Sequence, residues 1–221
     1  MESPGLKLTT GCRAMDDALT GGLETGSVTL VYGEAETGKT TLAMQCVAIC
    51  SSLGMKALYV DAGGGFSPLR FTQIAEAWGA SLNRVVVLRV EDFWSQDRLV
   101  ERMDSMLEGF RLLAFDTVTT LYMAELAGEK PFTLNRVLNR QVAELVEQAR
   151  RLDLAVLLLS QVTSAPGEGE KPVAQRILRY WSDVTVRLSL EDGMRYAYTE
   201  KPDLGRRFPY RISRRGIVDV E

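Results

Sequence analysis

The sequence contains no histidine and only three cysteines among its 221 residues. Without histidine, the chain cannot form Ser-His-Asp or Cys-His nucleophile systems, histidine proton shuttles or most zinc sites. The cysteines are Cys12, Cys46 and Cys50, an odd number with no CxxC pair, so we expect buried small apolar side chains rather than a metal or redox centre. Such cysteine usage is typical of a reducing compartment, and we expect a cytoplasmic protein.

Long hydrophobic runs are also missing. Runs such as Leu154–Leu159 are far shorter than the roughly 20 residues that span a bilayer. The N-terminus has no apolar stretch of the signal-peptide kind, so we expect neither secretion nor a membrane partner. With 46% hydrophobic and 25% charged residues, the composition is that of a globular protein, and the length favours one large domain.

The net charge of −3 is unevenly distributed. Between Arg195 and Arg215 there are seven basic residues and only two acidic ones, a local surplus of five positive charges. A negatively charged partner is one explanation of such a run, and a solvated strand surface is the other. The sequence does not separate a DNA partner from an acidic protein here.

Apolar runs with the length of buried strands alternate with helical stretches over the first 160 residues. We expect strands at Val28–Tyr32, Ala57–Asp61, Val85–Leu88, Leu112–Asp116 and Leu154–Ser160. We expect helices at Lys39–Leu53, Leu69–Trp78, Gln96–Gly109 and Thr133–Arg151. This alternation predicts an α/β fold with a mostly parallel central sheet flanked by helices.

The last third of the chain has shorter strand-like segments separated by turn residues. These segments are Val184–Leu190, Arg195–Thr199 and Phe208–Ile212, with turns at Asp192-Gly193 and Asp203–Gly205. They predict an antiparallel extension of the same sheet. Residues 162–172, between the two parts, are rich in Gly, Glu, Pro and Ser, and we expect them to form a loop.

The strongest motif is GEAETGKT, from Gly33 to Thr40, which fits the phosphate-binding pattern G-x-x-x-x-G-K-[ST]. It follows a predicted strand and opens a predicted helix, as this motif requires. Lys39 is expected to bridge the β- and γ-phosphates, and the Thr40 hydroxyl to bind Mg²⁺. Backbone N–H groups are expected to surround the phosphates. These belong to Glu36, Thr37, Gly38, Lys39, Thr40 and Thr41. The predicted cofactors are therefore ATP and Mg²⁺.

Two residues at the ends of predicted strands are expected to join this site. Asp116 follows four apolar residues and is expected to hold Mg²⁺ through water. Gln161 follows the next strand, where its amide either senses the γ-phosphate or makes an ordinary loop hydrogen bond. Glu34 and Glu36 would repel a triphosphate, so we expect both carboxylates to face solvent.

Several further segments resemble the RecA-superfamily recombinases. Thr9–Gly11 and Thr20–Gly22 resemble the start of the recombinase core, and YVDAGGGFSPLR at residues 59–70 is similar to its DTEGGFSPER segment. KPVA at 171–174 and RRGIVDVE at 214–221 resemble the archaeal recombinase paralogues of the RadB family in particular. The resemblance implies a single RecA-like ATPase core over residues 1–221, without an N-terminal helical DNA-binding domain.

The resemblance also implies a function. Such a protein would bind ATP and DNA, single-stranded DNA above all, and assist homologous recombination and repair alongside a recombinase or other recombination proteins. Arg70 would stack on adenine, and Gln161 would be the sensor glutamine. Residues 122–140 and 162–176 correspond to the two DNA-facing loops of the family. The cations expected to meet DNA phosphates there are Arg136, Arg140, Lys171 and Arg176.

One position departs from the family pattern in a way that affects catalysis. The family has a glutamate that orients the attacking water where this chain has Gly63. Loss of such a base costs a factor of about 10²–10⁴ in rate. We therefore expect ATP binding with slow hydrolysis or none, unless Glu36 or another carboxylate substitutes. An active DNA-dependent ATPase and a KaiC-like signalling ATPase without DNA binding are the alternatives, although KaiC-type proteins usually have paired glutamates at Ala62-Gly63. The oligomeric state stays open.

Overall fold

A computed structural model describes residues 5–126, 131–165 and 169–220. Its centre is a nine-stranded sheet with the order β13-β12-β11-β10-β3-β7-β6-β4-β5. The strands from β10 to β5 in this order run parallel to one another, which confirms the predicted mostly parallel sheet. They are β3 (Val28–Gly33), β4 (Lys56–Asp61), β5 (Val85–Arg89), β6 (Phe110–Asp116), β7 (Ala155–Ser160) and β10 (Val184–Glu191).

Three antiparallel strands extend this sheet, which confirms the predicted antiparallel extension, although Val184–Leu190, expected as its first strand, is β10 and runs parallel to β3. The three strands are β11 (Met194–Lys201), β12 (Asp203–Ser213) and β13 (Gly216–Asp219). The sequence analysis did not predict β13, because a strand of four residues has too few alternating positions to show a pattern. The pairing of β10 with β3 joins this C-terminal part to the phosphate-loop strand.

Two short strand pairs lie outside the central sheet. Near the N-terminus, β1 (Lys7–Leu8) pairs with β2 (Leu23–Glu24). The loop predicted over 162–172 is wrong in its described part, because β8 (Val162–Ala165) pairs there with β9 (Gly169–Pro172). The Gly- and Pro-rich composition hid this pair, since backbone hydrogen bonds rather than side-chain propensity hold the two strands together.

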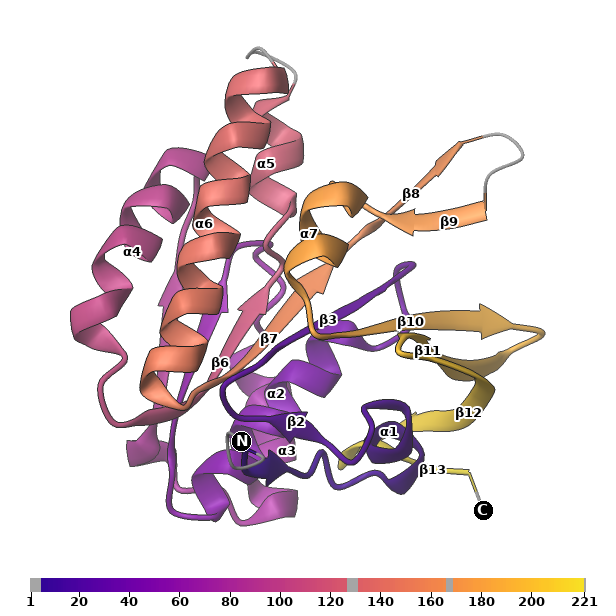
Figure 1. The fold of residues 1–221 in the computed structure, drawn as a ribbon. Coiled ribbons are helices and arrows are strands. Elements are labelled where there is room, and N and C mark those ends of the chain that lie inside the picture. The colour runs from indigo at the N-terminus through magenta and orange to yellow at the C-terminus, as the bar shows by residue number, and fades with distance from the viewer. Residues whose placement is uncertain (1–4, 127–130, 166–168, 221) are drawn as a thin grey trace.

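Helices cover both faces of the sheet (Figure 1). On one face, α2 (Lys39–Ser52) and α3 (Pro68–Trp78) pack together, and on the other α4 (Phe93–Met106) packs against α6 (Pro131–Leu152). Shorter helices are α1 (Arg13–Ala18), α5 (Thr120–Glu125), α7 (Gln175–Trp181) and the 3-10 turn η1 (Leu82–Arg84). The predicted helix at 96–109 begins three residues early, because the Asp92 carboxylate accepts the N–H of Ser95 and caps α4 there.

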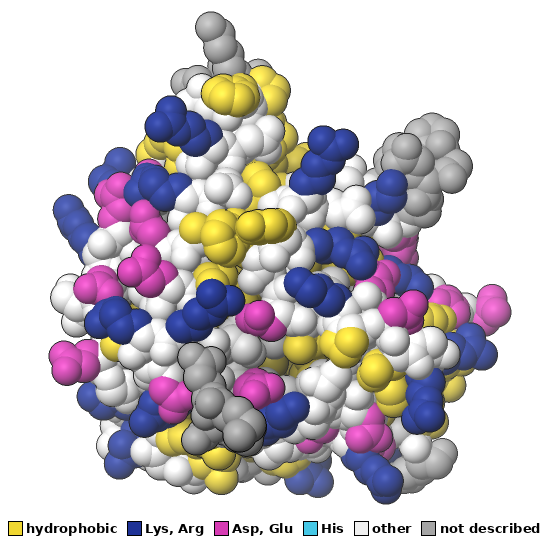
Figure 2. All heavy atoms as spheres, in the orientation of Figure 1, with side chains coloured by type: hydrophobic (Ala, Val, Ile, Leu, Met, Phe, Trp, Pro, Cys, Tyr) yellow, Lys and Arg dark blue, Asp and Glu magenta, His cyan; other side chains and the backbone are white. Residues whose placement is uncertain are grey.

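The two faces of the sheet have separate apolar cores, which explains the continuous apolar runs of the parallel strands. In β6, Leu112 and Ala114 pack in the core beneath α2 and α3, whereas Leu113 and Phe115 pack beneath α4 and α6. The three cysteines are buried, as predicted. Among the described helices, none is both long and apolar enough to cross a bilayer. Cations, anions and apolar side chains intersperse on the face shown in Figure 2.

Candidate nucleotide-binding site

The phosphate-loop motif connects β3 to α2 at the carboxyl ends of the parallel strands. Gly38 caps α2 with a φ of 96°, in the left-handed region that favours glycine. A Cβ atom added there would lie 2.7 Å from Cδ1 of Ile212, the end of a side chain that can move, so the positive φ rather than space is what favours glycine. The first turn of α2 opens onto a cavity of about 580 Å³, where its free N–H groups suit an anion.

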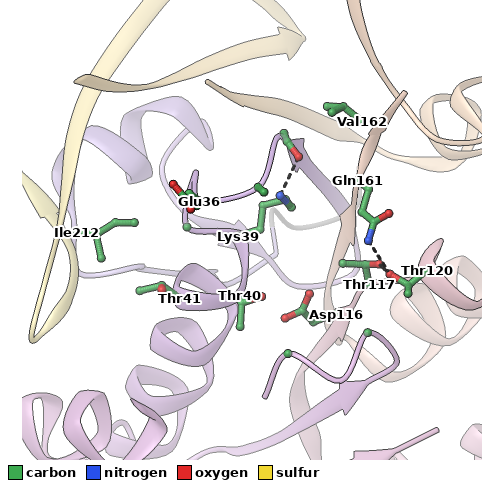
Figure 3. A pocket seen from close by; sticks show the side chains of 15 residues that line it. Glu36, Lys39, Thr40, Thr41, Asp116, Thr117, Thr120, Gln161, Val162 and Ile212 are labelled. Carbon is green, nitrogen blue, oxygen red and sulfur yellow. Dashed lines mark hydrogen bonds between the residues drawn. The ribbon is translucent and has the colours of Figure 1, made fainter. Parts of the chain in front are cut away.

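Most of the predicted cofactor-binding residues line this cavity (Figure 3). They are Gly33, Glu36, Gly38, Lys39, Thr40, Thr41, Asp116 and Gln161. Thr37 lies buried behind the loop, and its hydroxyl donates to the Glu34 carbonyl at 2.8 Å. Glu34 and Glu36 are exposed, as expected. Arg70 is not among the lining residues, since its guanidinium donates to the carbonyls of Ser213 and Arg214.

The half-buried Lys39 forms no hydrogen bond or ion pair with a carboxylate of the described residues. Its Nζ donates to the carbonyls of Gly33 and Glu34, each at 2.7 Å, within the same loop. Burial lowers the pKa of Lys39, although the carboxylates of Asp116, Glu170 and Glu34 act in the opposite direction. An anion in the cavity would favour the charged ammonium. The environment of Lys39 therefore fits a bound phosphate.

Asp116 ends β6 on the floor of the cavity, and Figure 3 shows it facing Thr40. Burial raises the pKa of Asp116, while hydrogen bonds from the hydroxyls of Thr40 and Tyr59 act against this shift. Tyr59 donates to the Asp116 carboxylate at 2.5 Å. A buried carboxylate beside a hydroxyl oxygen is the donor set that Mg²⁺ prefers, and the cation would offset the cost of ionising Asp116.

One part of the cavity lining has no carboxylate at the position where the family pattern has its glutamate. Gly63 lies there, and its N–H donates to the Asp116 carbonyl at 3.1 Å. The nearest atom to an added Cβ would be Oγ1 of Thr120 at 3.5 Å, an ordinary contact. Packing therefore does not require glycine at this position. Gln161 donates to Oγ1 of Thr120 at 3.1 Å, which fixes its amide at the edge of the cavity. Among the described lining residues, only Glu36 and Asp116 carry carboxylates.

The C-terminal strands supply residues that sequence reasoning missed. The Tyr210 hydroxyl on β12 donates to the Thr37 carbonyl at 2.7 Å, and the Arg195 side chain on β11 donates to the Glu36 carbonyl at 3.0 Å. Ile212 on β12 forms part of the cavity wall. Tyr210 is 173 positions from Thr37, so no local motif connects them. The only sequence feature that could have indicated these contacts is the predicted antiparallel extension of the sheet, because it brings β12 toward the phosphate loop.

Comparisons with known proteins agree with this architecture. The family model described as Rad51 matches residues 3–220. The chain is 36% identical over 226 residues to the DNA repair and recombination protein RadB of Thermococcus kodakarensis, covering 97% of this chain and 100% of that protein. A structure described as the crystal structure of the RadB recombinase has 34% identity and a TM-score of 0.82, covering 97% of this chain and all of its own. The chain belongs to the RadB family.

More distant relatives fit the same assignment. RadB of Methanocaldococcus jannaschii is 32% identical over 213 residues, covering 94% of this chain and 100% of that protein. A meiotic recombination protein DMC1 homolog of Arabidopsis thaliana is 31% identical, covering 85% of this chain but 60% of its own length. The RecA-like fold and the RadB resemblance predicted from the sequence are therefore confirmed.

The cations predicted to contact DNA in this RadB-family chain have different surroundings. Arg136 on α6 and Arg176 on α7 are exposed and line one hollow of about 620 Å³. Lys171 lies half-buried on β9. Arg140 instead forms ion pairs with three carboxylates, which belong to Asp97, Glu101 and Glu144. Arg136 and Arg176 are therefore accessible at the surface, whereas the ion pairs of Arg140 connect α4 to α6.

Proposed function

We propose that this protein is an ATP-binding, DNA-binding accessory protein of homologous recombination and DNA repair, with weak or absent ATP hydrolysis. Membership of the RadB family, whose members above are named DNA repair and recombination proteins, supports the biological role. The observation that carries the biochemical part is the contrast within one cavity. Lys39, Thr40 and Asp116 line this cavity and are the residue types that hold phosphate and Mg²⁺, while Gly63 offers no group to orient water.

In this proposal, the residues of the loop hold a triphosphate without activating it. Lys39 exchanges its carbonyl partners for phosphate oxygens, and the N–H groups of the first turn of α2 donate to the same ligand. Thr40 and Asp116 supply oxygen ligands for Mg²⁺, which neutralises phosphate charge when it is bound. Gln161 is the proposed sensor, because its hydrogen bond to Thr120 connects the cavity edge to α5. Arg70 has no part in this proposal, because its guanidinium binds the turn between β12 and β13 and does not line the cavity.

Calorimetric titration with ATP, with and without Mg²⁺, tests this assignment. We expect Mg²⁺-dependent binding by the wild-type protein and no measurable binding by Lys39→Ala. Unchanged nucleotide affinity in that variant contradicts the site. Mg²⁺-independent affinity in the wild-type protein would remove Thr40 and Asp116 from the metal role.

DNA binding is proposed for the side of the molecule that carries Arg136, Lys171 and Arg176. A gel-shift titration of single-stranded DNA against salt tests it, because counterion release predicts a log–log slope of about −0.7 per phosphate contact. The Arg136→Ala/Arg176→Ala variant should lose about 1.4 from the magnitude of that slope. Arg98→Ala/Arg102→Ala, on the exposed side of α4, is the matched control. No binding at low salt would remove DNA from the proposal.

One observation favours an active DNA-dependent ATPase as a second candidate. Glu170 on β9 lies near enough to Lys39 to act on its pKa, and burial together with the neighbouring Glu34 raises the pKa of Glu170. A carboxylate with a raised pKa beside the phosphate loop is a substitute for the missing base. Turnover above about 1 s⁻¹ that falls at least about tenfold in Glu170→Gln would support this candidate.

A further inference from the structure

A second hollow, of about 480 Å³, lies beside the turn between β12 and β13. Its lining residues include Trp78, Arg211, Ser213, Arg214, Arg215 and Asp219. We call it the Trp78 hollow. None of these residues lines the nucleotide cavity, although Ile212, on the same strand, does. It therefore stands on the other side of β12 from the phosphate loop and needs its own explanation.

The turn that carries the two exposed arginines is held rigidly. Arg70 donates to the Ser213 carbonyl at 2.6 Å and to the Arg214 carbonyl at 2.8 Å. The Trp78 indole N–H donates to the Arg215 carbonyl at 2.8 Å. Beneath the turn, the buried amide of Gln45 accepts from the N–H of Ile217 and donates to its carbonyl. A site ordered in advance loses less conformational entropy when a ligand binds.

The turn between β12 and β13 contributes two positive charges to the hollow. Arg214 and Arg215 are exposed, and neither forms an ion pair with a carboxylate of the described residues. The Arg215 guanidinium lies 5.3 Å from the centre of the Trp78 ring. Asp219 is the one acidic lining residue, and its carboxylate accepts the N–H groups of Arg13 and Ala14 at the start of α1.

The negative charge of Asp219 is already stabilised by the backbone N–H groups at the start of α1. Burial acts to raise the pKa of Asp219, but the backbone donors of Ala14 and Arg13 outweigh it and hold the pKa below its usual range. The carboxylate is therefore ionised but already satisfied by these donors. Within the described part of the chain, Arg214 and Arg215 therefore have no carboxylate partner in the hollow.

The Trp78 hollow is also remote from the proposed DNA contacts. In Figure 1, α1 and β13 lie at the lower end of the molecule, whereas α5, the start of α6 and the β8–β9 pair lie at the upper end. A DNA strand held at the upper end does not account for Arg214 and Arg215. The basic run noted in the sequence thus contains a cluster with a separate surface.

We propose that the Trp78 hollow docks an acidic segment of a partner protein, with carboxylates on Arg214 and Arg215 and an apolar side chain against Trp78. Tryptophan and arginine are the residues most enriched at the energetic centres of protein interfaces. Guanidinium forks pair bidentately with carboxylates. DNA phosphates instead recur along a strand and favour a row of cations, whereas these arginines converge on one hollow beside an indole. The proposal does not depend on the nucleotide site.

Fluorescence anisotropy with labelled acidic peptides tests the proposal on the full chain. The probes are Asp- and Glu-rich peptides of about 12 residues with one central Phe, Leu or Trp, and a matched set with Ala at the centre. We expect saturable binding by the wild-type protein, at least about tenfold weaker binding by Arg214→Glu/Arg215→Glu, and weaker binding of the Ala-centred set. The control is Arg98→Glu/Arg102→Glu on α4, which changes the net charge equally.

Three results overturn the proposal. One is the absence of saturable binding with every peptide. Another is that the α4 control variant loses as much peptide affinity as Arg214→Glu/Arg215→Glu. The third is that Arg214→Glu/Arg215→Glu, the turn variant, loses affinity for single-stranded DNA but not for the peptides, which makes the hollow a nucleic-acid site. Thermal unfolding checks that the turn variant is folded, and Arg214→Ala/Arg215→Ala replaces it if it is not. Binding of the Ala-centred peptides at full strength removes Trp78 from the site.

Discussion

Two sets of residues that line the nucleotide cavity differ in what they offer a ligand, and we call them the binding wall (Lys39, Thr40 and Asp116) and the Gly63 wall (Gly63 and Gln161). In the binding wall, the pKa values of Lys39 and Asp116 depart from their usual ranges in the direction that a bound Mg²⁺–phosphate ligand would reverse. The wall formed by Gly63 and Gln161 has an amide already engaged by Thr120 and an empty position where a base fits. One cavity can therefore retain the energetics of nucleotide binding while lacking a group for water activation.

The largest expected effect comes from removing the Lys39 side chain from the binding wall. Lys39→Ala should weaken ATP binding at least about 100-fold, or about 2.7 kcal/mol, because no other cation among the lining residues can reach the phosphates. Isothermal titration calorimetry measures this change. Lys56→Ala is the control, since Lys56 is an exposed lysine at the other end of the parallel strands. Equal affinities for wild type and Lys39→Ala would refute the assignment.

The second expected effect comes from adding a carboxylate to the Gly63 wall, at the position that lacks one. Gly63→Glu should raise ATP hydrolysis about 10- to 100-fold, because its Cβ meets only ordinary contacts and its carboxylate can orient water. ATP affinity should change little. Steady-state phosphate release measures the rate, and Gly63→Gln is the control of similar size without a base. Equal rates in both variants would show that the carboxylate is not what the wall lacks.

The third expected effect is that one substitution at Asp116 weakens Mg²⁺–ATP binding and at the same time stabilises the fold. Asp116→Asn should weaken Mg²⁺–ATP binding about tenfold, because it removes a charged ligand. Burial raises the pKa of Asp116, so its protonated form stabilises the fold at low pH and that stability is lost as pH rises through the raised pKa. Without nucleotide, Asp116→Asn should therefore have a higher melting temperature than wild type at pH 7. Each kcal/mol of added unfolding free energy raises the melting temperature by about 2–4 °C in a chain of this size.

Melting curves against pH check the sign of this effect. The advantage of Asp116→Asn should shrink as pH falls, because wild-type Asp116 then becomes neutral as well. A variant that melts below wild type at pH 7, while keeping its secondary structure, would contradict the stated cause of the shift.

The smallest effect concerns the support that β12 gives the loop. Tyr210→Phe leaves the Thr37 carbonyl without its hydroxyl donor and should cost about 1 kcal/mol of stability, with a few-fold weaker ATP affinity. Thermal unfolding and calorimetry measure the two effects. Tyr196→Phe is the control, because the Tyr196 hydroxyl makes no hydrogen bond among the described residues. Equal behaviour of both variants would remove Tyr210 as a support.

The parts of the site predicted from sequence are those that depend on neighbours in the chain. The phosphate loop, the strand before it and Asp116 at the end of β6 follow from local patterns of glycine and apolar residues. Tyr210 and Ile212 escaped prediction, because long-range sheet pairing brings them to the loop. Arg140 shows the same limit, since the carboxylates that pair with it lie partly on another helix.

The surface of the last third was predicted least well. The sequence analysis found the positive charge of residues 195–215 but did not divide it between surfaces. The fold places Arg195 against the phosphate loop, pairs Arg207 with Glu191, and exposes Arg214 and Arg215 beside Trp78. Alternation along strands and the position of each turn decide this division, and net charge carries no such information.

ATP turnover with and without single-stranded DNA tests the central claim most directly, using protein shown by calorimetry to bind Mg²⁺–ATP. The account predicts turnover below about 0.1 s⁻¹ in both conditions, well under the rates of ordinary enzymes, because no group on the Gly63 wall orients water. Turnover above about 1 s⁻¹ in either condition would contradict it.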